Sequence, residues 1–168
     1  MKILKLVIIL LFITSNHLKA DVFLTLEANL IRPACSVSVG HGSNALNINF
    51  FDVERELLSE GKKSFEIAID SCDLKKNLGI YLSPKEGSIL TVNNETVLET
   101  STRGLGIRFT QENNDAAINL QMWEPIFPTI RGRIALLQLH SQLVTSQAIE
   151  TLKAGPFNAS LSIMVDYY

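Results

Sequence analysis

The side chains with the clearest chemistry are two cysteines, Cys35 and Cys72. Neither belongs to a CxxC pair and neither has a neighbouring histidine, so the pattern does not favour a catalytic thiol. If the chain folds in an oxidising compartment, the expected chemistry is one disulfide. Such a bond would close a loop of nearly forty residues, and in the chain-entropy model it would stabilise the fold by ~4 kcal/mol.

Other catalytic and ligand-binding patterns are missing. His41 and His140 are isolated, and no HxxH, calcium-loop, GxSxG or phosphate-binding glycine pattern occurs. Gly104-Leu105-Gly106 is too short for a dinucleotide fingerprint. The closest acidic residues are interpreted as a solvated face: Glu54, Glu56 and Glu60. The sequence therefore predicts a protein that is not an enzyme and that has no cofactor, no metal site and no small-molecule substrate.

The first twenty residues have the pattern of a secretion signal. Lys2 and Lys5 precede the apolar run 6–13, which is too short to span a bilayer as a helix, and small Ala20 follows at a plausible cleavage site. The alternative is an N-terminal membrane anchor. Export would supply the oxidising compartment that a disulfide needs.

The predicted mature chain is mildly acidic. After residue 20, 12 basic and 17 acidic residues remain, a formal net charge of −5. This balance disfavours nucleic acid or an anionic membrane surface as a partner. The length suits a single domain with one core.

Alternating apolar and polar residues predict an all-β fold. Short segments with this pattern are separated by turn-forming glycine, asparagine and proline, which is typical of a β-sandwich. The expected strands are residues 22–30, 46–50, 65–69, 77–83, 88–92, 104–110, 134–144 and 157–167. Helical turns are expected only within 52–58 and 146–152.

Two prolines limit the segment around the single tryptophan. Pro125 and Pro128 favour a loop or an edge strand there, because proline cannot donate a main-chain hydrogen bond. Trp123 is interpreted as a packing residue rather than a platform for a ligand.

Several short motifs, in their order along the chain, resemble one family. They are TLEANLIRPACSV near the start, IDSC at the second cysteine, GLGIRF in the middle, and an end with Gly155 fourteenth from the C-terminus and Tyr167 penultimate. Together they resemble the pilin subunits of chaperone–usher fimbriae, in particular the minor tip subunits of P pili and the adaptor subunits of type 1 pili.

The resemblance implies a fold and a way of assembling. It implies an incomplete immunoglobulin-like β-sandwich of six strands that lacks its final strand and leaves a groove along the core. A periplasmic chaperone fills the groove first. At the outer-membrane usher, the N-terminal extension of the next subunit replaces it, and a fimbrium grows on the cell surface. The implied divisions are a signal peptide at 1–20, a donor-strand extension at 21–34 and a pilin domain at 35–168.

The resemblance assigns roles to both end segments. A donated strand must present an apolar side chain every second residue, and the extension does so with Val22, Leu24, Leu26, Ala28 and Leu30. The family usually has glycine where this chain has Ala28, which leaves the choice of partner open. The residues implied for the groove-edge strand, which pairs first with the chaperone and then with the donor, are Phe157, Leu161, Ile163, Val165, Tyr167 and Tyr168.

Residues 22–31 have a simpler interpretation as the first strand of a closed sandwich. Two alternative functions also stay open, a fibre-terminating subunit with a blocked groove and a subunit with its own adhesive surface. A two-domain adhesin is not expected, because Cys35 comes only fifteen residues after the predicted cleavage site.

Overall fold

The computed structural model describes residues 34–40, 42–113 and 115–168. The chain divides into two units, residues 1–31 and 32–168, and the described residues all belong to the second. The predicted signal peptide and the predicted donor residues Val22, Leu24, Leu26, Ala28 and Leu30 lie outside the described residues.

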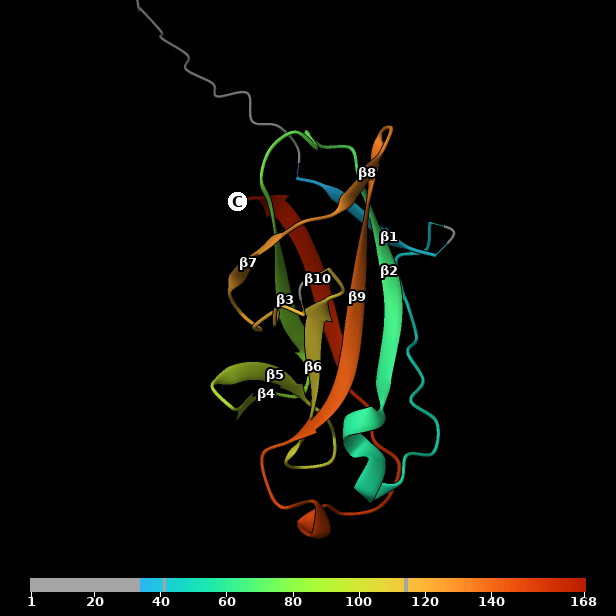
Figure 1. The fold of residues 1–168 in the computed structure, drawn as a ribbon, viewed down its shortest axis with the longest axis vertical. Helices are drawn as coiled ribbons and strands as arrows, with labels where there is room; N and C mark the ends of the chain where they lie inside the picture. The colour runs from blue at the N-terminus through green and yellow to red at the C-terminus, as the bar shows by residue number, and fades with distance from the viewer. Residues whose placement is uncertain (1–33, 41, 114) are drawn as a thin grey trace, which may run out of the picture. The chain divides into compact units, whose positions relative to one another are not determined.

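The described residues form ten strands and two short 3-10 helices (Figure 1). The strands are β1 (Ser36–Val39), β2 (Lys62–Asp70), β3 (Leu78–Glu86), β4 (Ile89–Val92), β5 (Glu95–Glu99), β6 (Leu105–Gln111), β7 (Trp123–Ile126), β8 (Thr129–Arg131), β9 (Ile134–Thr145) and β10 (Ser160–Tyr167). The helices are η1 (Arg55–Glu60) and η2 (Ile149–Thr151).

These strands form two antiparallel sheets. The larger has the order β1-β2-β9-β6-β5-β4, with β8 paired to β9, and the smaller has the order β10-β3-β7. Side chains from both sheets meet in one core, in which Ile67, Ile80 and Leu139 have no exposed surface. The all-β, immunoglobulin-like sandwich predicted from the sequence is confirmed. The described residues form more strands than the six that the resemblance implied, and the number is higher because it includes several short strands of three to five residues.

The register of the strands defines two ends of the domain. Ser36 pairs with Asp70, and the neighbouring Ile69 pairs with Ala135, which also pairs with Ile130. We call this end, which includes Cys35 and the β8–β9 turn, the disulfide end. At the other end η1 leads into the first residue of β2, and η2 follows the last residues of β9 (Figure 1). We call it the helical end.

Most expected elements are present, with one clear error. The expected strand at 46–50 does not form, because this segment has no strand partner among the described residues. β1 stops at Val39, where Gly40 adopts a positive φ of 57° and a bridge to Ser43 turns the chain. Apolar alternation at 46–50 therefore reflects side chains facing a groove, not a hydrogen-bonded strand.

The predictions of an edge strand around the prolines and of two helical turns are confirmed. β7, with Pro125 inside it, is an edge strand of the smaller sheet. The expected helical turns appear as η1 and η2, each a single short stretch of 3-10 helix. Trp123 packs on Tyr81 with ring centroids 5.4 Å apart, yet it stays 41% exposed.

Candidate functional site

An open apolar groove of about 620 Å³ runs between the two sheets. One wall is β1 and the following segment, which descends from Val37 to Phe50. The other wall is the chain from Phe157 through Ile163, which includes the first half of β10. The floor consists of core side chains from the strands behind: Phe65, Leu82, Leu98, Ile107, Phe109, Leu139 and Ser141.

Both walls end in an unpaired strand edge. Within the described part of the chain, β10 is the last strand of its sheet and pairs only with β3. β1 is the last strand of the other sheet, and its outer edge is paired only at Val39, which bridges to Ser43. An unpaired edge presents main-chain N–H and C=O groups that an added strand can pair with. The groove thus offers an apolar floor and hydrogen-bonding edges together.

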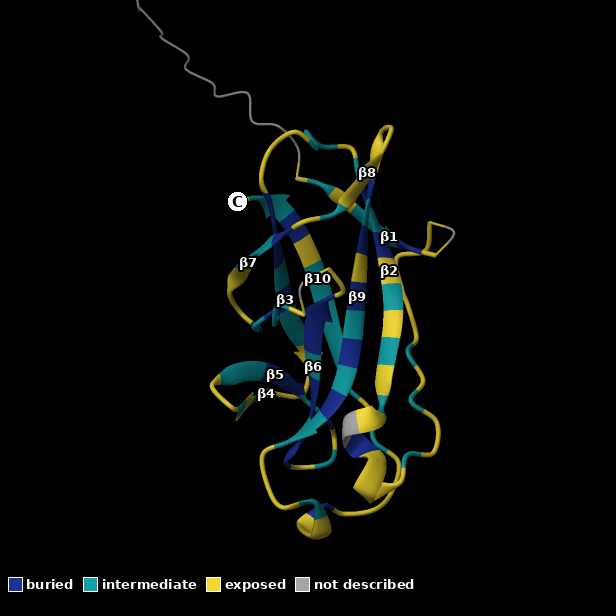
Figure 2. Ribbon diagram, viewed as in Figure 1, coloured by how far each residue is buried: buried dark blue, intermediate teal, exposed yellow. Residues whose placement is uncertain are grey.

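The first half of β10 is only partly buried, as the teal strand in Figure 2 shows. Leu161 and Ile163 face the groove and are half-buried. In contrast, β6 on the groove floor is buried at every position except Arg108. The side chains that a closing strand would cover are therefore in place and incompletely covered.

The second half of β10 is packed and does not line the groove. Val165 is buried at 3% exposure in the core. The Tyr167 hydroxyl accepts a hydrogen bond from the Asp73 main-chain N–H at 2.9 Å, and Lys76 Nζ lies 5.2 Å from the centre of the Tyr167 ring. This half is fixed to the loop between β2 and β3.

Tyr168 is 62% exposed and is held through its main chain, whose N–H donates to the Asn77 carbonyl at 2.9 Å. Its side chain lies against Gly79. A Cβ at that glycine would stand 2.8 Å from Tyr168 Cδ2, closer than real contacts allow. Gly79 therefore gives the terminal tyrosine its place on the sheet.

The predicted disulfide between Cys35 and Cys72 is present, with the two Cα atoms 4.8 Å apart. It joins the residue before β1 to the loop that follows β2. The Tyr167 hydrogen bond to Asp73 lies one residue further along that loop. Both strands that flank the groove are thus fixed at the disulfide end.

At the helical end the two walls meet through aromatic rings. Phe50 and Phe157 lie with ring centroids 6.4 Å apart, one from each wall. Beyond them a second hollow continues along residues 47–53 and 155–157. The two hollows share Phe50 and Phe157 in their linings, so this aromatic pair lies between them.

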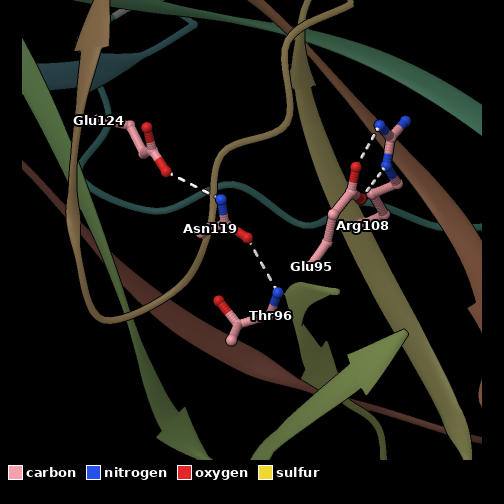
Figure 3. Close-up of polar contacts among 5 residues, drawn as sticks. All are labelled: Glu95, Thr96, Arg108, Asn119 and Glu124. Atoms are coloured by element: carbon pink, nitrogen blue, oxygen red, sulfur yellow. Dashed lines mark hydrogen bonds and ion pairs between the residues drawn. The ribbon is translucent and has the colours of Figure 1, made fainter. Parts of the chain in front are cut away.

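A group of polar side chains connects β5, β6, β7 and the loop that precedes β7 (Figure 3). The Arg108 guanidinium donates to both carboxylate oxygens of Glu95, at 2.5 and 2.9 Å. Asn119 accepts from the Thr96 main-chain N–H and donates to Glu124, both at 2.9 Å. The hydrogen bond from Arg108 lowers the pKa of Glu95, and the same bond raises the pKa of Arg108.

The residues assigned from the sequence divide into two groups. Phe157, Leu161 and Ile163 line the groove, whereas Val165, Tyr167 and Tyr168 do not. The floor residues and the wall at 43–50 were missed as site residues. The alternation at 46–50 was a usable signal, since it marks side chains facing an apolar surface.

Two kinds of site are absent from the described residues. They contain no group of three or more histidine, cysteine, aspartate or glutamate side chains placed to hold a metal ion. Within the same residues, no helix has the length and apolar character needed to cross a membrane.

Comparison with known proteins identifies the family. Residues 24–168 match the family described as fimbrial protein. The chain therefore belongs to the fimbrial protein family. It is 37% identical over 84 residues to the uncharacterized fimbrial-like protein YfcR of Escherichia coli (strain K12), a match that covers 49% of this chain and 46% of YfcR, so it spans about half of that relative's length.

Solved structures share the fold. The P pilus rod subunit PapA superposes with a TM-score of 0.61 at 16% identity, over 81% of this chain and 100% of PapA. The P pilus adaptor subunit PapF gives a TM-score of 0.55 at 20% identity, over 83% of this chain and 100% of PapF. Family and fold are those of structural pilus subunits rather than enzymes.

Proposed function

We propose that this chain is a subunit of a chaperone–usher fimbria and that it polymerises by donor-strand exchange. In this proposal residues 21–34 of a neighbouring subunit enter the groove and pair with β10. The observation that carries the proposal is the groove itself, an apolar channel between two unpaired strand edges. A periplasmic chaperone, an outer-membrane usher and neighbouring pilins are the partners, and the assembled fibre lies on the cell surface.

The chemistry of the predicted donor matches that of the groove. Burying Val22, Leu24, Leu26 and Leu30 would contribute ~1.5–3 kcal/mol each, or a gross ~6–12 kcal/mol before entropy is subtracted. Main-chain pairing along β10 would add to this. Ala28 would bring one methyl group to the floor, so the acceptor needs a shallow pocket there.

The open groove supports a chain-extending subunit over a fibre terminator, whose groove would be blocked. The proposal does not choose between an adaptor, another minor subunit and a rod subunit. Each of these would use the same two features, a donor segment and an acceptor groove.

The proposal is tested by refolding the chain with and without a donor. A variant that lacks residues 1–34 should aggregate or unfold on its own and become soluble when peptide 21–34 is added. A peptide in which Leu24 and Leu26 are replaced by aspartate is the matched control and should fail to rescue. A stable monomer of the shortened chain with no added strand would contradict donor-strand exchange.

One observation favours the alternative of a subunit with its own adhesive surface. Met164, Tyr81 and Trp123 pair directly in a row across β10, β3 and β7 on one face of the smaller sheet. Met164 and Trp123 are exposed and Tyr81 between them is half-buried. If the row binds a receptor, Trp123→Ala should abolish adhesion of cells that still assemble fibres. Unchanged adhesion of such cells would exclude this row as the adhesive surface.

A further inference from the structure

The β8–β9 hairpin is an exposed surface that the groove does not explain. Its tip carries Arg131 and Arg133, both exposed. Neither arginine forms an ion pair within the residues that the structure describes. Three large apolar side chains in the hairpin or just before it are also exposed, namely Phe127 at 60%, Ile130 at 54% and Ile134 at 43%.

The hairpin is held in a fixed position. The Gln111 side chain, 3% exposed, donates to the Pro125 carbonyl at 2.9 Å and accepts from the Phe127 main-chain N–H at 3.2 Å. The Asn113 amide donates to the Phe127 carbonyl at 3.1 Å. Because these bonds fix the base of the hairpin, its basic and apolar tip is organised before any partner arrives.

The helical end offers the complementary surface. Residues 52–60 include four acidic side chains and one basic one. Exposed apolar side chains accompany them, Phe51 at 74% and Leu57 at 43%. Lys63 Nζ lies 5.3 Å from the centre of the Phe51 ring, so the acidic side chains outnumber but do not exclude basic ones on this surface. The acidic side chains are all exposed and form no ion pair within the described part of the chain: Asp52, Glu54, Glu56 and Glu60.

Strand direction decides which ends meet in a fibre. β10 runs from the helical end to the disulfide end (Figure 1). Cys35, just after the donor segment, lies at the disulfide end, because it precedes Ser36, which pairs with Asp70. A donor antiparallel to β10 would finish at the acceptor's helical end, so the disulfide end of the donor subunit meets the helical end of the acceptor. A parallel donor would bring two disulfide ends together, and head-to-tail growth could not continue.

We propose that the β8–β9 hairpin of one subunit docks on the η1 segment, residues 51–60, of a second copy of this chain. The inference rests on the proposed function, because strand donation sets the two ends against each other. Opposite charges steer and orient the docking, and the exposed apolar residues on both sides give it area to bury. The contact would fix the angle between successive subunits, which the donated strand alone leaves free.

Charge reversal of the mature chain tests this contact. The chain is refolded with peptide 21–34, excess peptide is removed, and oligomer growth is followed by light scattering. Arg131→Glu with Arg133→Glu should slow growth about three- to tenfold at about 20 mM NaCl, and the difference should vanish near about 500 mM. Adding Glu54→Lys and Glu56→Lys to the same chain should restore growth to within about twofold.

A matched control separates this contact from a general effect of charge. Arg103→Glu with Lys153→Glu makes the same change in net charge at exposed positions near the helical end, and it should not slow growth. Equal slowing by both double variants, or no slowing by the hairpin variant, would overturn the docking contact.

Two further readouts keep the test decisive. Each variant should bind labelled peptide 21–34 as the parent does, which shows that it is folded. If the parent protein does not bind the peptide, the proposal of donor-strand exchange is contradicted, and the docking contact that rests on it is contradicted as well. In oligomers of the Arg131→Lys, Arg133→Lys variant, carbodiimide should link position 131 or 133 to an acidic residue among 52–60. Absence of such a link would count against the contact.

Discussion

The two halves of β10 have the same alternating sequence and opposite surroundings. In the first half, Leu161 and Ile163 face an open groove and are only half-buried. In the second half, Val165 is buried and Tyr167 is hydrogen-bonded to the loop after the disulfide. The main-chain edge of β10 is unpaired along both halves within the described residues. The halves differ in their apolar side chains, which are covered in the second half and partly exposed in the first.

This difference separates stability from assembly along a single strand. The packed half and the disulfide hold the edge strand in place. The open half can then receive a donated strand without reorganising. Substitutions in the packed half should therefore change stability, whereas substitutions in the open half should change binding of the donor.

The largest effect is expected from removing the disulfide. Because Cys35 and Cys72 have a sequence separation of 37, the paired substitution Cys35→Ala, Cys72→Ala should lower the free energy of unfolding by about 4 kcal/mol in the chain-entropy model. Urea unfolding of the peptide-bound protein measures it. A reductant should lower the free energy of unfolding of the parent by the same amount and should not change that of the variant. A loss of unfolding free energy below about 1 kcal/mol would show that the second half of β10 stays packed without the disulfide.

The next effect compares neighbouring inward positions of β10. Val165→Ala should lower the free energy of unfolding by about 2 kcal/mol, because it leaves a cavity in the core. In the absence of peptide, Ile163→Ala should lower the free energy of unfolding by less than Val165→Ala does, because the Ile163 side chain is half-exposed. The same substitution should weaken binding of peptide 21–34 about tenfold or more. Peptide titration of both variants is the measurement. Equal effects on peptide binding would remove the distinction between the halves.

A smaller effect is expected at the end of the packed half. Tyr167→Phe removes the acceptor for the Asp73 N–H and should cost about 1 kcal/mol. Peptide binding should be nearly unchanged, because Tyr167 does not line the groove. Thermal unfolding together with peptide titration checks both parts, and a large loss of peptide affinity would extend the donor site to this end.

The smallest effect lies away from β10. Glu95→Gln should cost less than about 1 kcal/mol near about pH 7, because the pair with Arg108 is partly exposed. The folded-state pKa of Glu95 is lowered from 4.5, so the pair's contribution is complete above that value and disappears as pH falls through the lower, folded-state pKa. Urea unfolding at a series of pH values should show the two proteins converging in acid. A constant difference would mean that ionisation of Glu95 is not its source.

Much of the fold was predictable because alternation and turn residues are local signals. Strands β2, β3, β4, β6, β9 and β10, the two helical turns and the edge position of β7 follow from them. The strands β1, β5 and β8 were not expected, although β5 contributes Val97 and Leu98 to the buried residues. The segment at 46–50 was assigned wrongly, because alternation reports which side chains face an apolar surface and not whether the main chain has a partner. The groove floor was missed for a related reason. A buried strand has the same apolar sequence pattern whether a further strand covers its side chains or a groove exposes them.

The sequence by itself determined an all-β fold, one disulfide, a structural rather than catalytic role, and the edge strand that contains Leu161 and Ile163. These depend on residue type and on spacing within short segments. Only the tertiary structure decided that the described residues leave the groove uncovered, that Val165 and Tyr167 lie outside it, and that a basic hairpin and an acidic segment occupy opposite ends. Those features depend on which distant strands meet, and the register of β1, β2, β9 and β10 sets them.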